Sequence, residues 1–380
     1  MTSSADGSAT PGEQVRRLDV PGGPVDVVLG RGLAEVAEEL TVLWSHLLIE
    51  AGTPGAAGEA TVLRYATAAD SSAKSLGPRD PGACYKISGD VTRAVLRALV
   101  GQRILLHAGT VLLEGAGTTV LLGASGAGKS TAATVLGREG LYLSDELTIV
   151  DPADLAITAY PKPVSRVQRG RTKQDVALAE LGLRTAPGAG PADTVVLLDR
   201  DPEAAEPSLT RVGLAEAVAV VAGQSSSLWR LPDPLGVIAR MLTGAGGALR
   251  ARYREATELA GLLADLPDRC PQPWETVDPD GTADPAGTGA PHRPAPGLTA
   301  APFVQALRSE DATVVLQEGR TGTLTGLAEL VWDLVREQGP IDPANLEALV
   351  VAEAGDHDRS ADLVQAALEQ VRSAGLLQEG

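Results

Sequence analysis

Apolar residues recur with two different spacings along the first hundred residues. Alternation of apolar and polar residues is typical of strands, whereas apolar residues three or four positions apart are typical of helices. On this basis we expect a strand within 17–29, a helix over 34–49, strands over 60–65 and 84–88, and a helix over 90–100. Residues 1–15 are rich in Ser, Gly, Ala and Thr and are predicted to be disordered. The remainder, 16–100, is predicted to form an N-terminal α+β region.

The next part of the chain, 101–267, alternates short apolar runs with glycine-rich turns. Two of the runs, 111–113 and 119–122, flank Glu114-Gly115-Ala116-Gly117, a sequence that predicts a β-hairpin. The further elements expected are a helix over 129–136, strands over 141–143, 147–150 and 194–198, and helices over 177–183, 213–221, 235–242 and 249–266. Because a helix lies between strands of this region, a right-handed βαβ unit is expected. The pattern therefore predicts an α/β core domain.

The last third of the chain begins with a change in composition. Residues 268–300 are dense in Pro and Gly and show little periodicity, so we interpret them as a flexible linker. Beyond them the pattern predicts strands over 303–307 and 313–316 and helices over 326–337, 343–352 and 361–373. This order predicts a separate, winged-helix-like α+β domain over 301–380.

Charge and composition narrow the classes of protein. The chain has 380 residues, enough for two or three domains. Its 49 acidic and 32 basic residues give a net charge of −17, which argues against nucleic acid or a membrane surface as the main partner. Cys84 and Cys270 are too few for a disulfide framework and too distant in sequence for a metal cluster. We find no signal-peptide pattern and no apolar run of membrane-spanning length, and we expect a cytoplasmic protein.

Residues 118–131, TTVLLGASGAGKST, carry a phosphate-binding motif of the form G-x-x-x-x-G-K-S between an apolar strand and a helix start. Glycines allow the tight turn, and the backbone N–H groups then converge on an anion site. Lys129 can reach the β- and γ-phosphates of ATP, and the Ser130 hydroxyl can ligate the Mg²⁺ that bridges them. The residues expected to contact the nucleotide are Gly123, Ala124, Ser125, Gly126, Ala127, Gly128, Lys129, Ser130 and Thr131.

Two acids follow at the end of the next strand, one helix after the loop. Asp145 and Glu146 are expected near the phosphates, because the carboxyl ends of parallel strands share one edge of a sheet. One acid can ligate Mg²⁺ together with Ser130, and the other can meet an incoming hydroxyl; the sequence leaves the division between them open. His107 follows the apolar run 104–106, and a lone histidine in such a place is more often structural than catalytic.

A basic run and several competing motifs complete the candidate chemistry. Arg166, Arg169, Arg171 and Lys173 either meet phosphate or an acidic substrate or form a solvated loop, and we hold both interpretations. The segment 278–281 fits the D-x-x-G pattern of GTPases but lies in the predicted linker without a preceding strand. We find neither N-K-x-D nor L-S-G-G-Q, which disfavours a Ras-like GTPase and an ABC ATPase.

The centre of the chain resembles the HPr kinase-like group of P-loop phosphotransferases. The matching features are Leu106-His107-Ala108 before the hairpin, the phosphate loop, the acid pair a single helix later, and Tyr160-Pro161-Lys162-Pro163. The resemblance implies a mixed-sheet core, a Mg²⁺ ligand and a general base at Asp145 and Glu146, and catalytic or supporting roles for Lys129 and His107. The family has Asp at both acid positions, so Glu146 departs from it. The longer glycine-rich signature of true HPr kinases is missing, which disfavours HPr itself as the substrate.

Residues 301–380 resemble the PqqD-like peptide-recognition domain of biosynthetic systems for ribosomally made peptides. The matching features are Leu324 just before a helix that contains Val331-Trp332-Asp333-Leu334, a third helix, and Gly375-Leu376-Leu377. The resemblance implies that a leader peptide adds as a strand to the edge of the small sheet, which would involve Val314, Leu316 and the neighbouring helix. For Trp332 we favour core packing over direct peptide contact.

Together these features predict an ATP-dependent kinase that phosphorylates a Ser or Thr hydroxyl of a ribosomally synthesised precursor peptide, whose leader binds residues 301–380. A kinase of a small metabolite or of another protein is an alternative. A nucleotide-binding peptide carrier without turnover is another. The sequence leaves open the acceptor, the choice between ATP and pyrophosphate as donor, the role of 16–100 and the oligomeric state, a homo-oligomer included.

Overall fold

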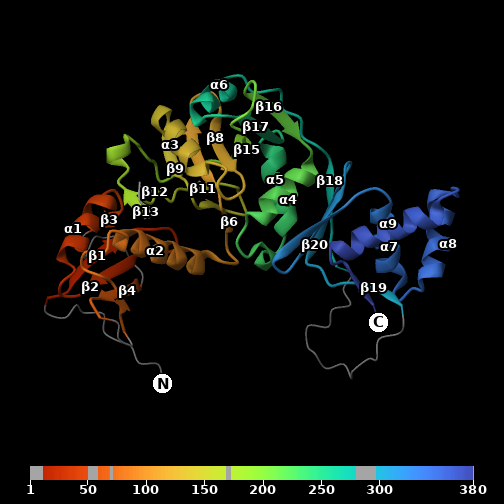
Figure 1. Cartoon of the computed structure of the whole chain (residues 1–380), viewed down its shortest axis with the longest axis horizontal. Helices are drawn as coiled ribbons and strands as arrows, with labels where there is room; N and C mark the ends of the chain where they lie inside the picture. Colours follow the sequence, from red (N-terminus) through yellow and green to blue (C-terminus); the bar gives the residue numbers. More distant parts are fainter. Residues whose placement is uncertain (1–11, 50–58, 69–71, 168–172, 280–296, 380) are drawn as a thin grey trace. The chain divides into compact units, whose positions relative to one another are not determined.

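The chain forms a mixed α/β protein with several sheets and, among the described residues, nine α-helices (Figure 1). The computed structural model describes residues 12–49, 59–68, 72–167, 173–279 and 297–379. Backbone contacts divide the chain into two compact units. The first unit comprises Met1–Ala192, Val196–Ser208 and Ala251–Leu266, and the second comprises Asp193–Val195, Leu209–Arg250 and Pro267–Gly380. The mixed α/β class predicted from the sequence is thereby confirmed.

The N-terminal part of the first unit is a mixed five-stranded sheet packed against two helices. Its strand order is β3-β1-β2-β4-β5, with β1 antiparallel to β2 and β2 parallel to β4. The bounds are β1 Gln14–Leu18, β2 Val25–Leu29, β3 Leu48–Ile49, β4 Thr61–Ala66, β5 Lys74–Ser75, α1 Ala34–Leu43 and α2 Ala83–Leu99. Residues of both helices and of β1 and β2 share one apolar core. The α+β character expected for this region is present.

Helix α2 replaces two predicted elements. We expected a strand over 84–88 and a helix from residue 90, but a single helix includes both. Cys84, Ile87 and Val91 are all buried, and their spacing of three and four places them on one face of that helix. The apolar run at 84–88 was too short to distinguish a strand from the first turns of a helix.

The phosphate-binding motif lies beside a predicted hairpin that the structure confirms. Strands β7 Gly109–Leu113 and β8 Gly117–Leu122 pair antiparallel, and β9 Leu141–Ser144 pairs with the other side of β7. Helix α3 Lys129–Glu139 connects β8 to β9. Four neighbouring strands of this six-stranded sheet have the order β15-β8-β7-β9, where β15 is Thr194–Arg200 and its residues 196–200 belong to the first unit. Since β7 opposes both neighbours, β8 and β9 run parallel, one strand apart, and their carboxyl ends share an edge.

A second sheet of this unit connects the N-terminal region to the segment after the acids. Its antiparallel order is β14-β11-β10-β6, and a separate hairpin is formed by β12 and β13. The bounds are β6 Ile104–Leu106, β10 Thr148–Val150, β11 Ile157–Thr158, β12 Val164–Val167, β13 Lys173–Val176 and β14 Gly188–Ala189.

Tyr160 and Pro161, which follow β11, are fixed by the N-terminal region. The Trp44 and Tyr160 ring centroids are 6.5 Å apart, and the Thr92 and Tyr160 hydroxyls are 3.0 Å apart. The His46 ring donates to the Pro161 carbonyl at 2.6 Å, and burial lowers the pKa of this histidine. Residues of the N-terminal region thus support the segment that leads into Lys162.

Two predicted helices have other structures. The segment 177–183 contains only the short 3₁₀ turn Ala179–Leu181. The segment 249–266 contains strand β17 Ala248–Tyr253, the 3₁₀ turn Ala256–Glu258 and the short helix α6 Leu259–Ala264. In β17, Ala251 and Tyr253 are buried whereas Arg252 between them is exposed, which is the two-residue period of a strand.

The second unit combines the C-terminal domain with part of the predicted core. Its four-stranded antiparallel sheet has the order β18-β20-β21-β22. Helices α4 and α5 contact this sheet, and helices α7, α8 and α9 pack with one another beside it (Figure 1). The bounds are α4 Leu214–Gly223, α5 Pro234–Gly244, β16 Ser208–Val212, β18 Trp274–Val277, β20 Gln305–Ser309, β21 Thr313–Gln317, β22 Arg320–Leu324, α7 Leu327–Gln338, α8 Pro343–Ala354 and α9 Ser360–Ser373.

Residues 209–250 were predicted to belong to the core domain over 101–267, but they group with the C-terminal sheet. The side chains of β20 and β21 explain this difference. Ala306 and Val315 belong to the core that α7–α9 cover, whereas Leu307 and Val314 point to the opposite face and are also fully buried. Buried Gln305 ties α5 to the sheet, since its side-chain oxygen accepts from the Leu235 N–H at 2.8 Å.

The predicted linker contains two strands. β18 lies within 268–300 and pairs with β20, and β19 Leu298–Ala300 pairs with β23 Leu377–Glu379. The pairing partners lie far away in sequence, so the local Pro and Gly content could not reveal these strands. The central part of the predicted linker, 280–296, lies outside the described residues, as does most of the N-terminal segment predicted to be disordered. That prediction is wrong for Gln14 and Val15, which begin β1 and pair with β2.

Trp332 lies in the core of the second unit, as expected. Its side chain is fully buried and meets the Phe303 ring edge-on, with centroids 5.3 Å apart. We expect Trp332→Ala to reduce the free energy of unfolding of this unit by about 3–5 kcal/mol, because it leaves a large cavity. Chemical denaturation followed by circular dichroism measures this. A loss under about 1 kcal/mol would contradict the packing described for α7.

Candidate functional site

The phosphate loop has the backbone geometry that its glycines predict. Gly126 and Gly128 have φ of +85° and +88°, a region that side-chain-bearing residues rarely adopt. A Cβ on Gly123 would lie 2.9 Å from the Ala127 Cβ. Tyr253 supports the loop from β17, since its hydroxyl donates to the Ala127 carbonyl at 2.9 Å. The loop therefore presents its backbone to the start of α3 in a fixed form.

Lys129 begins helix α3 and is buried, with 6% of its surface exposed. Its Nζ donates to the carbonyl of Gly123 at 2.7 Å and to that of Ala124 at 3.2 Å. Burial lowers the pKa of this ammonium. The cation thus lies within the loop and has only carbonyl oxygens as partners in the described contacts, which leaves its charge available for an anion.

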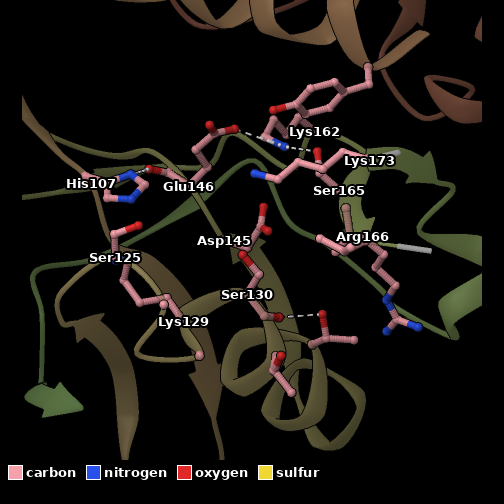
Figure 2. Close-up of a pocket in the computed structure, with 17 residues that line it drawn as sticks. His107, Ser125, Lys129, Ser130, Asp145, Glu146, Lys162, Ser165, Arg166 and Lys173 are labelled. Carbon is pink, nitrogen blue, oxygen red and sulfur yellow. Dashed lines mark hydrogen bonds and ion pairs between the residues drawn. The ribbon is translucent and has the colours of Figure 1, made fainter. Parts of the chain in front are cut away.

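Asp145 lies just beyond β9 and is almost completely buried. The Tyr142 hydroxyl donates to one carboxylate oxygen at 2.7 Å, which fixes the orientation of the side chain. Figure 2 shows the Ser130 side chain directed towards the Asp145 carboxylate. The two residues come from the ends of different elements, α3 and β9, and meet as the topology predicts.

Glu146 points to the other side of the site and is half-exposed. One of its carboxylate oxygens lies 3.0 Å from the Lys162 Nζ. Lys162 is buried and also donates to the Pro163 carbonyl at 3.1 Å and to the Ser165 hydroxyl at 3.3 Å. Burial alone would lower the pKa of Lys162, but the nearby carboxylates of Asp145, Glu146 and Asp175 outweigh it and raise the pKa. Lys162 is therefore a permanent cation beside the acid pair.

These groups line one hollow of about 700 Å³ in the first unit (Figure 2). The lining includes the predicted residues Ser125, Gly126, Gly128, Lys129, Ser130, Thr131, His107, Asp145 and Glu146. The His107 Nδ1–H donates to the backbone carbonyl of Glu146 at 3.1 Å, so this side chain contacts the backbone of the acid segment and not the Glu146 carboxylate. Gly123, Ala124 and Ala127 belong to the same loop but do not line the hollow.

The basic run predicted near residue 170 also contributes to this hollow. Arg166 lies on β12 and Lys173 on β13, and both line it. Of the two interpretations of this run, the placement of these two residues agrees with a surface that meets an anion. Arg169 and Arg171 lie outside the described residues.

The residues around Ser130 fit a magnesium ion bound together with a triphosphate. Among the described residues no group of three or more His, Cys, Asp or Glu side chains forms a metal site. Mg²⁺ bound to nucleotides needs few protein ligands, since phosphate oxygens and waters supply the others. The Ser130 hydroxyl and the second oxygen of Asp145 are the donors suited to that role, and Glu146 is already paired with Lys162.

Lys162 is the main site residue that sequence reasoning did not assign. It belongs to the segment that resembles the kinase family, but no role was attached to it. The available signal was a lysine between two prolines in an otherwise apolar extended stretch, and such a lysine needs acidic partners if it is buried.

The second unit requires one correction. We expected a peptide to add at Val314 and Leu316, but both belong to β21, which pairs with β20 on one side and β22 on the other. Both side chains are buried. Strand addition needs an unpaired edge, and the edges of this sheet are β18 and β22.

None of the helices that the structure describes combines the length and apolarity needed to cross a membrane. Comparison of the chain with family models and with curated proteins found no match to either.

Proposed function

We propose that the protein is an ATP-dependent kinase that phosphorylates a Ser or Thr hydroxyl of a precursor peptide. The observation that carries the proposal is the meeting of a P-loop lysine, Ser130 and two adjacent acids in one hollow. Phosphoryl transfer needs positioning and charge neutralisation more than covalent chemistry. The resemblance to the HPr kinase-like group, for both fold and chemistry, is part of the same proposal.

The loop and Lys129 bind the triphosphate of ATP. Backbone N–H groups of the loop and the start of α3 face the phosphate oxygens, and the Lys129 ammonium turns from the loop carbonyls to the β- and γ-phosphates. Ser130 and Asp145 would hold Mg²⁺, which neutralises charge on the phosphate oxygens when bound. The fixed orientation of Asp145, set by Tyr142, suits a ligand better than a mobile base.

Glu146 acts as the general base in this proposal. The acceptor hydroxyl transfers its proton to the Glu146 carboxylate while its oxygen bonds to the γ-phosphorus. The bond between the γ-phosphorus and the β–γ bridging oxygen breaks, and ADP leaves. The products are the phosphorylated hydroxyl, ADP and one proton, which Glu146 releases to water. The half-exposed position of Glu146 gives the acceptor access that buried Asp145 lacks.

The PqqD-like resemblance of the C-terminal domain supports a peptide as acceptor. We propose that the leader adds at β22, which is one of the two edge strands of this sheet. The Thr323 carbonyl on β22 points away from β21, since it accepts from Gln370 of α9 at 3.5 Å. Backbone groups on this side are thus directed towards a strand that would bind between β22 and α9.

Substitution of Thr323 tests peptide recruitment. Thr323→Pro removes the backbone N–H beside that carbonyl, and we expect at least about tenfold weaker leader binding. Gln370→Ala leaves the backbone intact and exposes the carbonyl, so it should bind the leader as well as the wild type or better. Fluorescence anisotropy with peptides encoded beside the protein's own reading frame measures both. Equal binding by the wild type and Thr323→Pro would rule out the β22 edge.

An acceptor screen tests the proposed reaction. The protein, ATP and Mg²⁺ are incubated with those peptides and with a set of hydroxyl-bearing metabolites, and mass spectrometry locates added phosphate. We expect phosphate on a Ser or Thr of one peptide. Phosphate only on a metabolite would favour the metabolite kinase, and peptide and ATP binding without any product would favour the carrier.

Lys162 offers a separate prediction. Lys162→Met removes the cation shared by Asp145, Glu146 and Asp175, and we expect the free energy of unfolding to fall by about 1–3 kcal/mol and turnover to decrease as Glu146 loses its position. Lys173→Met removes an exposed lysine of the same hollow and should leave stability unchanged. Thermal denaturation and initial rates measure the two effects. Equal stability of both variants would contradict the buried network.

A further inference from the structure

A second hollow of the first unit lies next to the phosphate site and has no role in the reaction proposed above. Its volume is about 350 Å³. It is formed by one side of α2 together with β4 and β5, and its lining residues include Tyr65, Lys74, Tyr85, Lys86 and Arg93. Both hollows belong to the same compact unit.

The lining of this second hollow is cationic, although the whole chain has a net charge of −17. Lys74, Lys86 and Arg93 supply three positive charges, and Asp90 is the one carboxylate among the described lining residues. The side chains of Lys74, Lys86 and Arg93 are 60%, 60% and 56% exposed, so a ligand in the hollow can contact them while they pair with Asp90 and Asp80. A concave surface of one sign concentrates ligands of the opposite sign.

Asp90 pairs with two of these three cations, Lys74 and Arg93. It is buried and accepts from the Tyr65 hydroxyl at 2.6 Å, from the Lys74 Nζ at 2.6 Å and from the Arg93 guanidinium. Burial alone would raise the pKa of Asp90, but hydrogen bonds from Lys74, Tyr65 and Arg93 lower it, so the group is a carboxylate. One buried charge therefore fixes two exposed cations in place, and Lys86 pairs separately with Asp80.

Tyr85 connects the two hollows, because it lines both. The Lys173 Nζ lies 5.7 Å from the centroid of its ring, on the side of the phosphate site. Arg166, Lys173 and Lys162 continue the cationic lining from there towards Glu146. A chain that passes Tyr85 could thus place one group at Glu146 and another among Lys74, Lys86 and Arg93.

We infer that this second hollow binds carboxylate side chains of the acceptor peptide, close in sequence to the hydroxyl that is phosphorylated. The inference rests on the proposed function and narrows its substrate to acidic Ser or Thr segments. Lysine and arginine donors bind carboxylates through charge-assisted hydrogen bonds. Free inorganic phosphate offers the same chemistry from another source, and the experiment separates the two.

The test measures binding in the absence of ATP, so it does not depend on turnover. The probe is a fluorescein-labelled octapeptide, Gly-Gly-Ser-Glu-Asp-Glu-Gly-Gly, and its twin has Gln-Asn-Gln at the acidic positions. Fluorescence anisotropy with the full chain should show at least about tenfold tighter binding of the acidic peptide. Lys86→Gln and Lys74→Gln should each remove most of this preference. Arg97→Gln removes an exposed charge from the same helix outside the hollow and should keep it.

Each outcome decides the inference. Equal binding of the two peptides, or a preference that Lys86→Gln and Lys74→Gln leave unchanged, overturns it. Binding of inorganic phosphate that depends on Lys86, without binding of the acidic peptide, also overturns it in favour of free phosphate. A preference that depends on Lys86 and Lys74 supports it, even if the acceptor screen finds no phosphorylated product, in which case only the proposed function fails.

Discussion

Lys129→Ala is expected to lower the rate of phosphoryl transfer by about a hundredfold or more. The lysine is buried in the loop, and among the described contacts its ammonium has only the carbonyls of Gly123 and Ala124 as partners, so its charge is available to the phosphates, whereas Lys162 is already paired with Glu146. ATP binding should weaken as well, because the lysine contacts the triphosphate before the reaction starts. Initial rates with the best acceptor and calorimetric titration with ATP measure the two effects.

The control for this variant lies on the same helix. Arg138→Ala removes a positive charge near the end of α3, where the Arg138 Nε donates to the Leu181 carbonyl. It should change the transfer rate less than about twofold, because it lies outside the hollow. If Lys129→Ala and Arg138→Ala retain equal activity, the loop is not the site of the reaction.

Glu146→Gln and Asp145→Asn are expected to separate the roles of the two acids. Glu146→Gln keeps an oxygen for Lys162 but cannot take a proton, so kcat should fall by about a hundredfold to a thousandfold with ATP affinity unchanged. Asp145→Asn should instead raise the Mg²⁺ concentration needed for half-maximal rate, because a neutral amide binds the ion less tightly than a carboxylate. Initial rates over a magnesium series measure both.

Glu139→Gln provides the matched control for this pair. It neutralises an exposed carboxylate at the end of α3 and should leave both kcat and the magnesium requirement unchanged. The assignment of roles is reversed if Asp145→Asn lowers kcat at saturating Mg²⁺ while Glu146→Gln shifts the magnesium requirement. Equal effects of both acid variants on both quantities would mean that the acids act as one unit.

Sequence reasoning located the loop and the acid pair because their signals are local. The motif is continuous, the hairpin turn precedes it directly, and the acids follow the next strand by a short segment. The topology differs in one respect, since β7 lies between the two parallel strands. The carboxyl ends of β8 and β9 still lie at the same edge of the sheet, because β7 is antiparallel to each of them.

Features that depend on distant partners were not accessible in this way. Lys162 belongs to the site because the fold places its Nζ beside the Glu146 carboxylate. Likewise, β18 forms a strand because it pairs with β20. Helices α4 and α5 were predicted correctly from their local apolar pattern. The surface against which these helices pack is evident only from the structure, in which both faces of β20 and β21 are buried. The strand predicted over 84–88 was wrong for another reason. So short an apolar segment fits both the two-residue period of a strand and the 3.6-residue period of a helix.

The most direct test follows the γ-phosphoryl group itself. Wild-type protein is incubated with ATP labelled at the γ-phosphate, Mg²⁺ and the peptides encoded beside its reading frame, and the label is traced in every product. The account predicts label on a Ser or Thr hydroxyl, with almost none in the Lys129→Ala reaction. Label that stays on ATP, or that appears only as inorganic phosphate at the same rate in both proteins, while ATP and peptide bind, would contradict it.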